Sequence, residues 1–326
     1  MQAVSLNNSV VSPIQNNHRG IVFVICAMTV FSVQDVLIKL LSDQVSLFQV
    51  LFIRSLVGVF LIAGFLKITG QAVKFGTAYP FLSSLRGVLF FFAYSAFYFA
   101  QSKMPIANAL VLFLVSPFFI TILSIFAFGS QVGYSRWITM IIGFFGVVVI
   151  SQPEFGEFNL FYLLPVMVAL IYAISMTIAK KTADKDTVYQ QVIIMYTITA
   201  VLSGALGFLI GDGQYDTPEF SAIQFMTRAW NFDGFFIISS LAAITIVGTV
   251  GFLMLTSAYR IADPATITPF EYSGLISAII WGFVFWNDIP SMKEIIGMTL
   301  IVGSGMFLFY REMVRGQQTA MESPLR

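Results

Sequence analysis

Long apolar runs recur along this chain, and they constrain its fold more than any other feature. Each is about twenty residues long, enough to cross the ~30 Å hydrocarbon core of a bilayer as an α-helix. Only 10% of the 326 residues are charged, well below the roughly 25% of soluble domains. The sequence therefore predicts an all-α integral membrane protein. The runs fall at 20–41, 45–66, 82–102, 105–127, 134–151, 160–180, 188–210, 234–258, 263–286 and 293–311, which gives ten transmembrane helices.

The remaining composition excludes several classes of protein. A net charge of +1 argues against a general nucleic-acid-binding role. With one cysteine, Cys26, and one histidine, His18, neither a disulfide framework nor a Cys/His metal site is expected. The sequence has no phosphate-binding glycine loop, nucleophile elbow or paired-aspartate motif. We therefore expect no enzyme activity, no cofactor and no bound metal.

The two halves of the chain resemble each other. Residues 31–39, Phe-Ser-Val-Gln-Asp-Val-Leu-Ile-Lys, align with residues 172–180, Tyr-Ala-Ile-Ser-Met-Thr-Ile-Ala-Lys. At the same offset of 141, Gln49 falls on Gln190. Later in each half, Ala100-Gln-Ser-Lys-Met-Pro-Ile-Ala resembles the segment that begins at Ala258, at an offset of 158, because the second half has a longer loop.

This similarity predicts two repeats of five helices each. An odd number of spans inserts the two copies in opposite orientations, which is the architecture of alternating-access carriers with a site between the halves. We expect inverted repeats at 20–152 and 159–311, with cytoplasmic tails at 1–19 and 312–326.

Five ionisable residues lie inside predicted spans: Asp35, Lys39, Arg54, Arg86 and Glu271. Each would cost roughly 2.5 to 3.5 kcal/mol at mid-bilayer if it faced lipid, so function is the default hypothesis. Asp35 and Lys39 are four residues apart on one helical face, and we expect them to pair. The alternatives are structural ion pairs, or snorkelling for Lys39 and Arg86, which lie near span ends.

Aromatic and polar side chains share one face of the third predicted span. They are Arg86, Phe90, Tyr94, Phe97, Tyr98 and Gln101. An aromatic stripe alone is more often packing, but the hydroxyls and the amide favour the surface of a cavity. We expect Tyr172 and Ser175 of span six and Tyr272 of span nine to line the other side.

Two further patterns concern helix shape and packing. Pro117 and Pro269 lie inside apolar runs, where proline removes a helical hydrogen bond and bends the helix. Small residues let helices approach closely, so we expect spans five and ten to form a structural or homodimer-forming pair. Their glycines are Gly143, Gly146, Gly297, Gly303 and Gly305.

Several segments resemble the EamA-type carriers of the drug/metabolite transporter superfamily. They are Met104-Pro-Ile-Ala-Asn-Ala, Val115-Ser-Pro-Phe, Arg136-Trp, Gly143-Phe-Phe-Gly, Ile267-Thr-Pro-Phe-Glu-Tyr and Phe285-Trp-Asn-Asp-Ile-Pro. The resemblance covers about 20–311, although Gly129-Ser130 and Asn287-Asp288 replace the family's usual Gly-Glu. A second set of segments is similar to the subgroup of S-adenosylmethionine uptake carriers, which implies that their charged positions line the central cavity. These are Asp35-Val-Leu-Ile-Lys, Arg54, Ser84-Leu-Arg-Gly and Pro269-Phe-Glu-Tyr.

The resemblance implies secondary transport of a small metabolite across a bacterial inner membrane by alternating access. Amino acids and their derivatives, including S-adenosylmethionine, are the first candidates, with a coupled proton or an exchanged metabolite as the driving partner. The alternative class is a non-transporting membrane sensor or assembly partner. We expect Arg54 and Arg86 to hold a carboxylate of the substrate. Glu271 is expected either to couple binding to the conformational change or to be a fixed partner of Arg54.

Lysine and arginine positions orient the spans. Because the number of spans is even, both termini lie on one side. With the termini inside, eleven of the seventeen basic residues fall in inner loops and tails, and only Lys103, Arg228 and Lys293 fall in outer loops. This bias follows the positive-inside rule and predicts cytoplasmic termini, with the loop at 211–233 outside.

Cysteines introduced at Gln214 and Gln317 test this orientation. We expect a membrane-impermeant thiol reagent to label Gln214→Cys on intact cells, because the loop at 211–233 is predicted to be outside. Gln317→Cys should react only after the membrane is opened. Labelling of both positions from the outside would contradict the predicted orientation.

Overall fold

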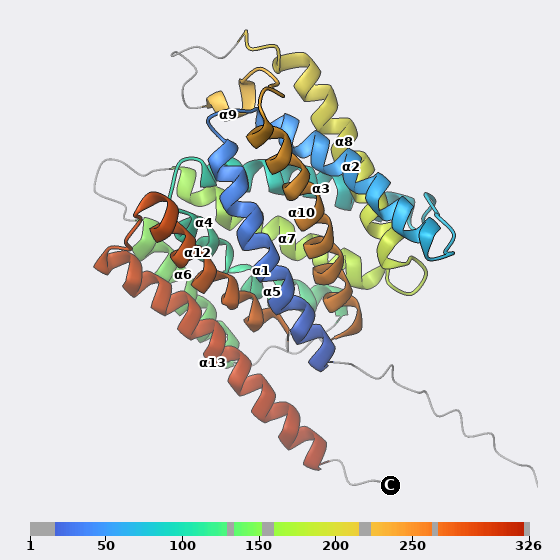
Figure 1. Ribbon diagram of the computed structural model, residues 1–326. Helices are drawn as coiled ribbons and strands as arrows, with labels where there is room; N and C mark the ends of the chain where they lie inside the picture. The colour runs from blue at the N-terminus through green and yellow to red at the C-terminus, as the bar shows by residue number, and fades with distance from the viewer. Residues whose placement is uncertain (1–16, 129–133, 152–159, 215–222, 263–266, 323–326) are drawn as a thin grey trace, which may run out of the picture.

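The computed structural model describes residues 17–128, 134–151, 160–214, 223–262 and 267–322, and every element in these ranges is a helix (Figure 1). The elements are α1 (Asn17–Leu41), α2 (Leu47–Ile68), α3 (Pro80–Gln101), α4 (Ile106–Phe113), α5 (Ser116–Phe128), α6 (Tyr134–Ser151), η1 (Leu160–Tyr162), α7 (Leu163–Lys181), α8 (Val188–Ile210), α9 (Gln224–Thr227), α10 (Phe235–Ile261), η3 (Thr268–Tyr272), α12 (Ser273–Trp286) and α13 (Met292–Glu322).

These elements correspond to the ten predicted spans. Six helices, α1, α2, α3, α7, α8 and α10, are long and apolar enough to cross a membrane unbroken. The other four spans are α4 with α5, α6, η3 with α12, and α13. The predicted all-α membrane fold is therefore confirmed. The last helix continues past the predicted end of its span, to Glu322.

The two spans that contain proline are broken. Span four divides into α4 and α5, with Pro117 in the first turn of α5, where its missing N–H costs no helical bond. In span nine, Thr268–Tyr272 form the 3₁₀ helix η3, and the α-helix α12 follows from Ser273. The hydroxyl of Tyr272 donates to the carbonyl of Leu114 at 3.4 Å, which links the two breaks. The distortions expected at both prolines are therefore present as interruptions of the α-helix.

Helices at equivalent positions in the two repeats are counterparts, and the main contacts between helices of the two repeats recur when every helix is replaced by its counterpart. α1 packs on α10 as α7 packs on α3, and α1 packs on α12 as α7 packs on α5. α3 packs on α8 as α10 packs on α2. Three further pairs, α2 with α8, α4 with α12 and α6 with α13, each join a helix to its own counterpart. In Figure 1, α13 runs along one edge of the bundle and α8 lies on the opposite side. This exchange of contacts is what an inverted repeat requires.

The aligned glutamines make equivalent contacts at opposite ends of the bundle. The Gln49 amide donates to the Asn231 carbonyl at 2.5 Å and accepts from its N–H at 2.8 Å, just before α10. The Gln190 amide donates to the carbonyl of Gly76 at 3.0 Å, in the segment before α3. α10 and α3 are counterparts in the two repeats. The two glutamines that align at an offset of 141 therefore make equivalent contacts, one from each repeat.

Glycines bring α6 and α13 into backbone contact. A Cβ added at Gly146 would lie 2.8 Å from the carbonyl oxygen of Gly297, and one added at Gly297 would overlap the side chain of Ile150. Gly303, in contrast, has no neighbour within 4 Å of such an atom. The predicted structural pair of spans five and ten is present, and neither helix reaches the central cavity described below.

Alanine at Gly146 should destabilise the protein, because its Cβ would meet backbone that cannot move unless α13 separates from α6. Overpacking of this kind typically costs about 1–3 kcal/mol. We expect a lower unfolding temperature for Gly146→Ala in detergent and none of this loss for Gly303→Ala. Equal losses in the two variants would show that the contact between α6 and α13 is not tight.

Candidate functional site

A cavity of about 120 Å³ lies between the two halves of the bundle. Eighteen of the described residues line it; eight of them are aromatic, and Asp35 is the one charged residue among them. The lining comprises Met28, Phe31 and Asp35 of α1; Leu89, Phe90, Ala93, Tyr94, Phe97 and Tyr98 of α3; Leu110 and Phe113 of α4; Val168, Ile171, Tyr172, Ser175 and Met176 of α7; and Phe252 and Leu255 of α10. A carboxylate among aromatic faces is an arrangement suited to a cation.

The cavity lies where the repeats meet. In the alignment of the two halves, Phe31 corresponds to Tyr172 and Asp35 to Met176, and all four residues line the cavity. The two helices that carry them, α1 and α7, are counterparts in the repeat. The backbone frame of the cavity is therefore symmetric, whereas the acid comes from the first half alone.

Aromatic rings form a continuous series around the cavity. The ring centre of Tyr94 lies 4.5 Å from the ring centre of Phe90 and 5.0 Å from that of Tyr98. On the facing side, the ring of Phe113 lies 5.8 Å from Phe97 and 5.0 Å from Tyr172. Each ring thus packs against a neighbouring ring, and the lining offers aromatic faces on which a flat group can stack.

Hydrogen bonds from α1 and α3 fix the carboxylate of Asp35. The hydroxyl of Tyr98 donates to its Oδ1 at 2.9 Å. The amide of Gln34, the preceding residue, donates to the Tyr98 hydroxyl and to the Tyr94 hydroxyl, the latter at 3.1 Å. Gln34 and Asp35 are 0% and 7% exposed, so this network is closed to bulk solvent except through the cavity. It holds the acid at the cavity surface.

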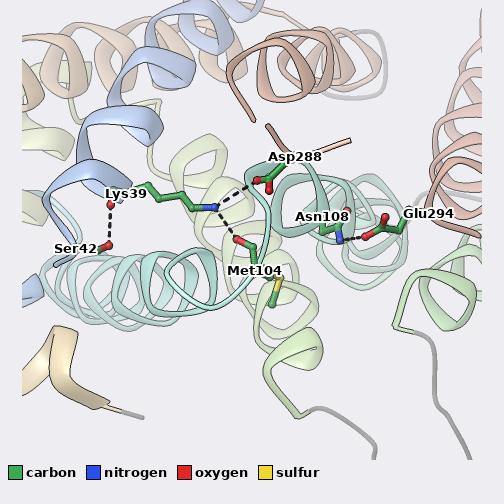
Figure 2. Close-up of polar contacts among 6 residues, drawn as sticks. All are labelled: Lys39, Ser42, Met104, Asn108, Asp288 and Glu294. Carbon is green, nitrogen blue, oxygen red and sulfur yellow. Dashed lines mark hydrogen bonds and ion pairs between the residues drawn. The ribbon is translucent and has the colours of Figure 1, made fainter. Parts of the chain in front are cut away.

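Lys39 does not pair with Asp35, and the predicted pair is wrong. Its ammonium lies 3.9 Å from Asp288 Oδ2 and donates to the Met104 carbonyl at 3.1 Å (Figure 2). The Trp286 ring lies 4.7 Å from the same nitrogen. Lys39 lies one turn beyond Asp35, and its long side chain extends to these partners. The carboxylate of Asp35 accepts a hydrogen bond from the hydroxyl of Tyr98 instead. Lys39 therefore joins α1 to both broken spans at this end.

The end of α12 fixes the position of Asp288. Asn287 has a left-handed backbone, with φ of 55°. The N–H of Asn287 donates to the Phe283 carbonyl and that of Asp288 to the Gly282 carbonyl, both at 3.1 Å. A left-handed residue whose N–H bonds to the carbonyl four residues earlier is an αL helix ending, which turns the chain away from the helix. The local sequence Trp-Asn-Asp-Ile-Pro thus turns the acid towards Lys39.

A second, more polar cavity, of about 180 Å³, lies at the same end. Its acids are Asp288 and Glu294, and the amide of Asn108 donates to Glu294 (Figure 2). Glu294 also accepts the N–H of Ser291 at 2.7 Å, at the start of α13. Both acids thus have structural partners, so we assign this cavity no ligand.

Glu271 does not line the cavity itself, but it is hydrogen-bonded to a residue that does. It is fully buried in η3, and its Oε1 accepts the hydroxyls of Tyr172 at 2.7 Å and Tyr259 at 2.6 Å. Of these, Tyr172 lines the cavity. Among the described residues, no basic side chain lies within 4.0 Å of this carboxylate. The alternative that Glu271 is a fixed partner of Arg54 is therefore wrong.

The two buried arginines also lie behind the cavity surface. Arg86 donates to Ser175 at 3.3 Å, to Gln191 at 3.3 Å and to Thr256 at 3.4 Å, so it joins α3 to α7, α8 and α10. Arg54 lies against the ring of Tyr94, with 4.2 Å between its guanidinium carbon and the ring centre. Neither guanidinium lines the cavity.

Among the ten predicted site residues, four line the cavity directly: Asp35, Tyr94, Tyr98 and Tyr172. Gln101 is buried at the end of α3 outside the lining, and Tyr272 bonds to span four. The sequence reasoning missed Phe113, Phe252 and Tyr259. Aromatic residues on an apolar helix look alike whether they face lipid or a cavity, so the sequence carried no signal for the first two. Tyr259 does carry one, since a tyrosine hydroxyl at the end of an apolar span needs a partner if it is buried.

These features, a bundle of inverted repeats with a cavity between them, define a membrane carrier. The model of the EamA-like transporter family matches twice, at residues 18–152 and 159–310, and the chain belongs to this family. A crystal structure that is 16% identical covers 88% of this chain and 94% of its own, with a TM-score of 0.62, and it shares the fold.

Relatives at low identity are all named as transporters or exporters. The S-adenosylmethionine uptake transporter of Rickettsia prowazekii is 25% identical over 90% of this chain and 93% of its own. The pseudopaline exporter CntI of Pseudomonas aeruginosa is 22% identical over 87% of this chain and 93% of its own. The riboflavin transporter of Rhizobium johnstonii is 28% identical over 78% of each chain. The protein is thus a transporter and not an enzyme.

Proposed function

We propose that the protein is a secondary active transporter of a small zwitterionic or cationic metabolite that contains a flat ring, and that S-adenosylmethionine is its first candidate substrate. The observation that carries this proposal is the single carboxylate, Asp35, among eight aromatic side chains of the central cavity. Aromatic faces and an acid together attract a positive charge that has left water.

The chemistry of S-adenosylmethionine fits these groups. Its adenine ring stacks on aromatic faces, and its sulfonium and ammonium groups are cations of the kind that Asp35 and the tyrosines attract. A transporter of this substrate is among the relatives that align over most of the chain. A fully neutral ring compound would gain nothing from the buried acid, which costs free energy unless a cation approaches it.

The proposal includes an orientation and a driving partner. Both termini are cytoplasmic, in a bacterial inner membrane, so the end that holds Lys39 and Asp288 faces outward. Separation of α1 from α12 at this end requires breaking that ion pair and withdrawing Lys39 from Met104. In alternating access, this outer end then opens while the cytoplasmic end closes, and the reverse. A coupled proton or an exchanged metabolite drives accumulation.

Uptake of radiolabelled S-adenosylmethionine into proteoliposomes tests the substrate. We expect concentrative or exchange-driven uptake by the wild type and a loss of about tenfold or more in Asp35→Asn, because a charge-assisted contact is worth about 1.5–3 kcal/mol. Asp43→Asn is the matched control, since Asp43 is exposed in the turn after α1. No uptake of this or any other tested metabolite by folded protein would instead favour a non-transporting sensor or assembly partner.

We also propose that Glu271 takes up and releases the coupled proton. It touches the cavity only through Tyr172, and its Oε2 has no hydrogen-bond partner among the described residues. A buried acid that lacks a cation is stabilised by a proton. Substrate contact with Tyr172 would change the hydrogen bonding of this carboxyl group and hence its affinity for that proton.

Glu271→Gln keeps the shape of the side chain and removes its titration. We expect concentrative uptake to fail in this variant and its pH dependence to flatten, while substrate-for-substrate exchange survives. Glu294→Gln, at the start of α13, should keep the pH profile of the wild type. Full accumulation with an unchanged pH profile in Glu271→Gln would remove this residue from the coupling mechanism.

A further inference from the structure

Arg54 is a buried cation with no ion-pair partner among the described residues. Its side chain is 1% exposed, and its one hydrogen bond in that part of the chain is to the carbonyl of Gly248 at 3.5 Å. Its Nε and Nη1 atoms have no hydrogen-bond partner there. An isolated charge in such a site costs several kcal/mol after relaxation, by order of magnitude. Its retention in the core of a carrier therefore calls for an electrostatic role.

Aromatic faces supply part of the stabilisation. The guanidinium carbon lies 4.2 Å from the ring centre of Tyr94, 5.4 Å from that of Tyr196 and 5.6 Å from that of Phe90. Each such cation–π contact is worth roughly 0.5–2 kcal/mol, depending on desolvation. Tyr94 and Phe90 also line the cavity, so Arg54 contacts residues of the cavity lining without being part of it.

Arg54 is also close to the network that holds Asp35. A Cβ placed on Gly248 would overlap both Gln34 Oε1 and Arg54 Nε, so these two atoms occupy the space that this glycine leaves. Gln34 Oε1 has no hydrogen-bond partner among the described residues. From Gln34 the hydrogen bonds continue through Tyr98 to the Asp35 carboxylate. Only neutral groups thus separate the buried cation from the buried anion.

We propose that Arg54 is a positioning residue that keeps Asp35 ionised and thereby gives the empty cavity its preference for cations. The guanidinium does not touch the substrate. Its field acts on Asp35 across Gln34, Tyr94 and Tyr98, and both charges are buried, where they are screened less than in water. The effect of Arg54 on transport rests on the proposed function. The coupling between the charges of Arg54 and Asp35 can be tested without a substrate.

The surroundings of Asp35 leave Arg54 as the cation that acts on it. α3 presents the hydroxyls of Tyr94 and Tyr98, and α2 presents Arg54. On its other sides, α1 packs against α10, α12 and η3. Gly248, Gly251 and Trp281 contact α1 near this point, and the acid of η3, Glu271, is bound by the hydroxyls of Tyr172 and Tyr259. None of these residues is a cation, and Lys39 is engaged by Asp288 and Met104.

A double-mutant cycle on the unfolding temperature of purified protein tests the coupling. Asp35→Asn leaves Arg54 without an anion, and Arg54→Gln leaves Asp35 without a cation, so each single change should lower the unfolding temperature. The double variant is neutral and should lose clearly less than the sum of the two single losses. Losses that simply add would overturn the proposal, whatever the protein transports. Arg86→Gln, combined with Asp35→Asn, is the matched buried-arginine pair, for which we expect additive losses.

Uptake measurements supply a second readout that a merely structural arginine would not move. In Arg54→Gln, Asp35 should hold its proton to higher pH, so uptake at neutral pH should fall by about tenfold or more and recover in more alkaline buffer. Arg54→Lys, which keeps the cation, should restore the profile. Decarboxylated S-adenosylmethionine separates this role from direct binding of a carboxylate. It should lose uptake in Arg54→Gln as much as S-adenosylmethionine does, and a loss confined to the carboxylated substrate would overturn the proposal.

Discussion

The structure depends on one physical requirement, that polar and charged groups inside a bilayer find their partners within the protein. Helices satisfy the backbone, and the central contacts between them satisfy the side chains. Asp35, Arg54, Arg86 and Glu271 are each 7% exposed or less, and their hydrogen-bond partners among the described residues are side-chain hydroxyls, an amide and a backbone carbonyl. These neutral partners leave the charges able to respond to a ligand.

The inverted repeat supplies a symmetric frame that the side chains then make unequal. Counterpart helices α1 and α7 face each other across the cavity, yet Asp35 is matched by Met176 and Phe31 by Tyr172. One side therefore carries the acid, and the other carries the tyrosine that leads to Glu271. A carrier needs a frame with two equivalent arrangements and a site that prefers one ligand, and this division provides both.

The sequence was sufficient for the frame and insufficient for the partners. Hydropathy located the ten spans because a membrane imposes a length and a composition on each helix, and the offset of 141 located the paired contacts of Gln49 and Gln190. Spacing alone wrongly paired Asp35 with Lys39, because helical position says nothing of a tyrosine on another helix. Asp288 was seen only as a departure from the family's usual residue, yet a left-handed Asn287 turns it onto Lys39. Long side chains and helix ends decide such contacts, and neither can be derived from periodicity.

The central claim is that a cation–carboxylate contact inside an aromatic cavity selects the substrate. Calorimetric binding of S-adenosylmethionine and S-adenosylhomocysteine to the purified protein tests it most directly, because the two ligands share the ring and the amino acid and differ in the methyl group and the sulfonium charge. The account predicts that S-adenosylmethionine binds at least about tenfold more tightly, as expected for one desolvated cation–π or charge-assisted contact. Equal affinities, or tighter binding of the uncharged sulfur compound, would contradict it.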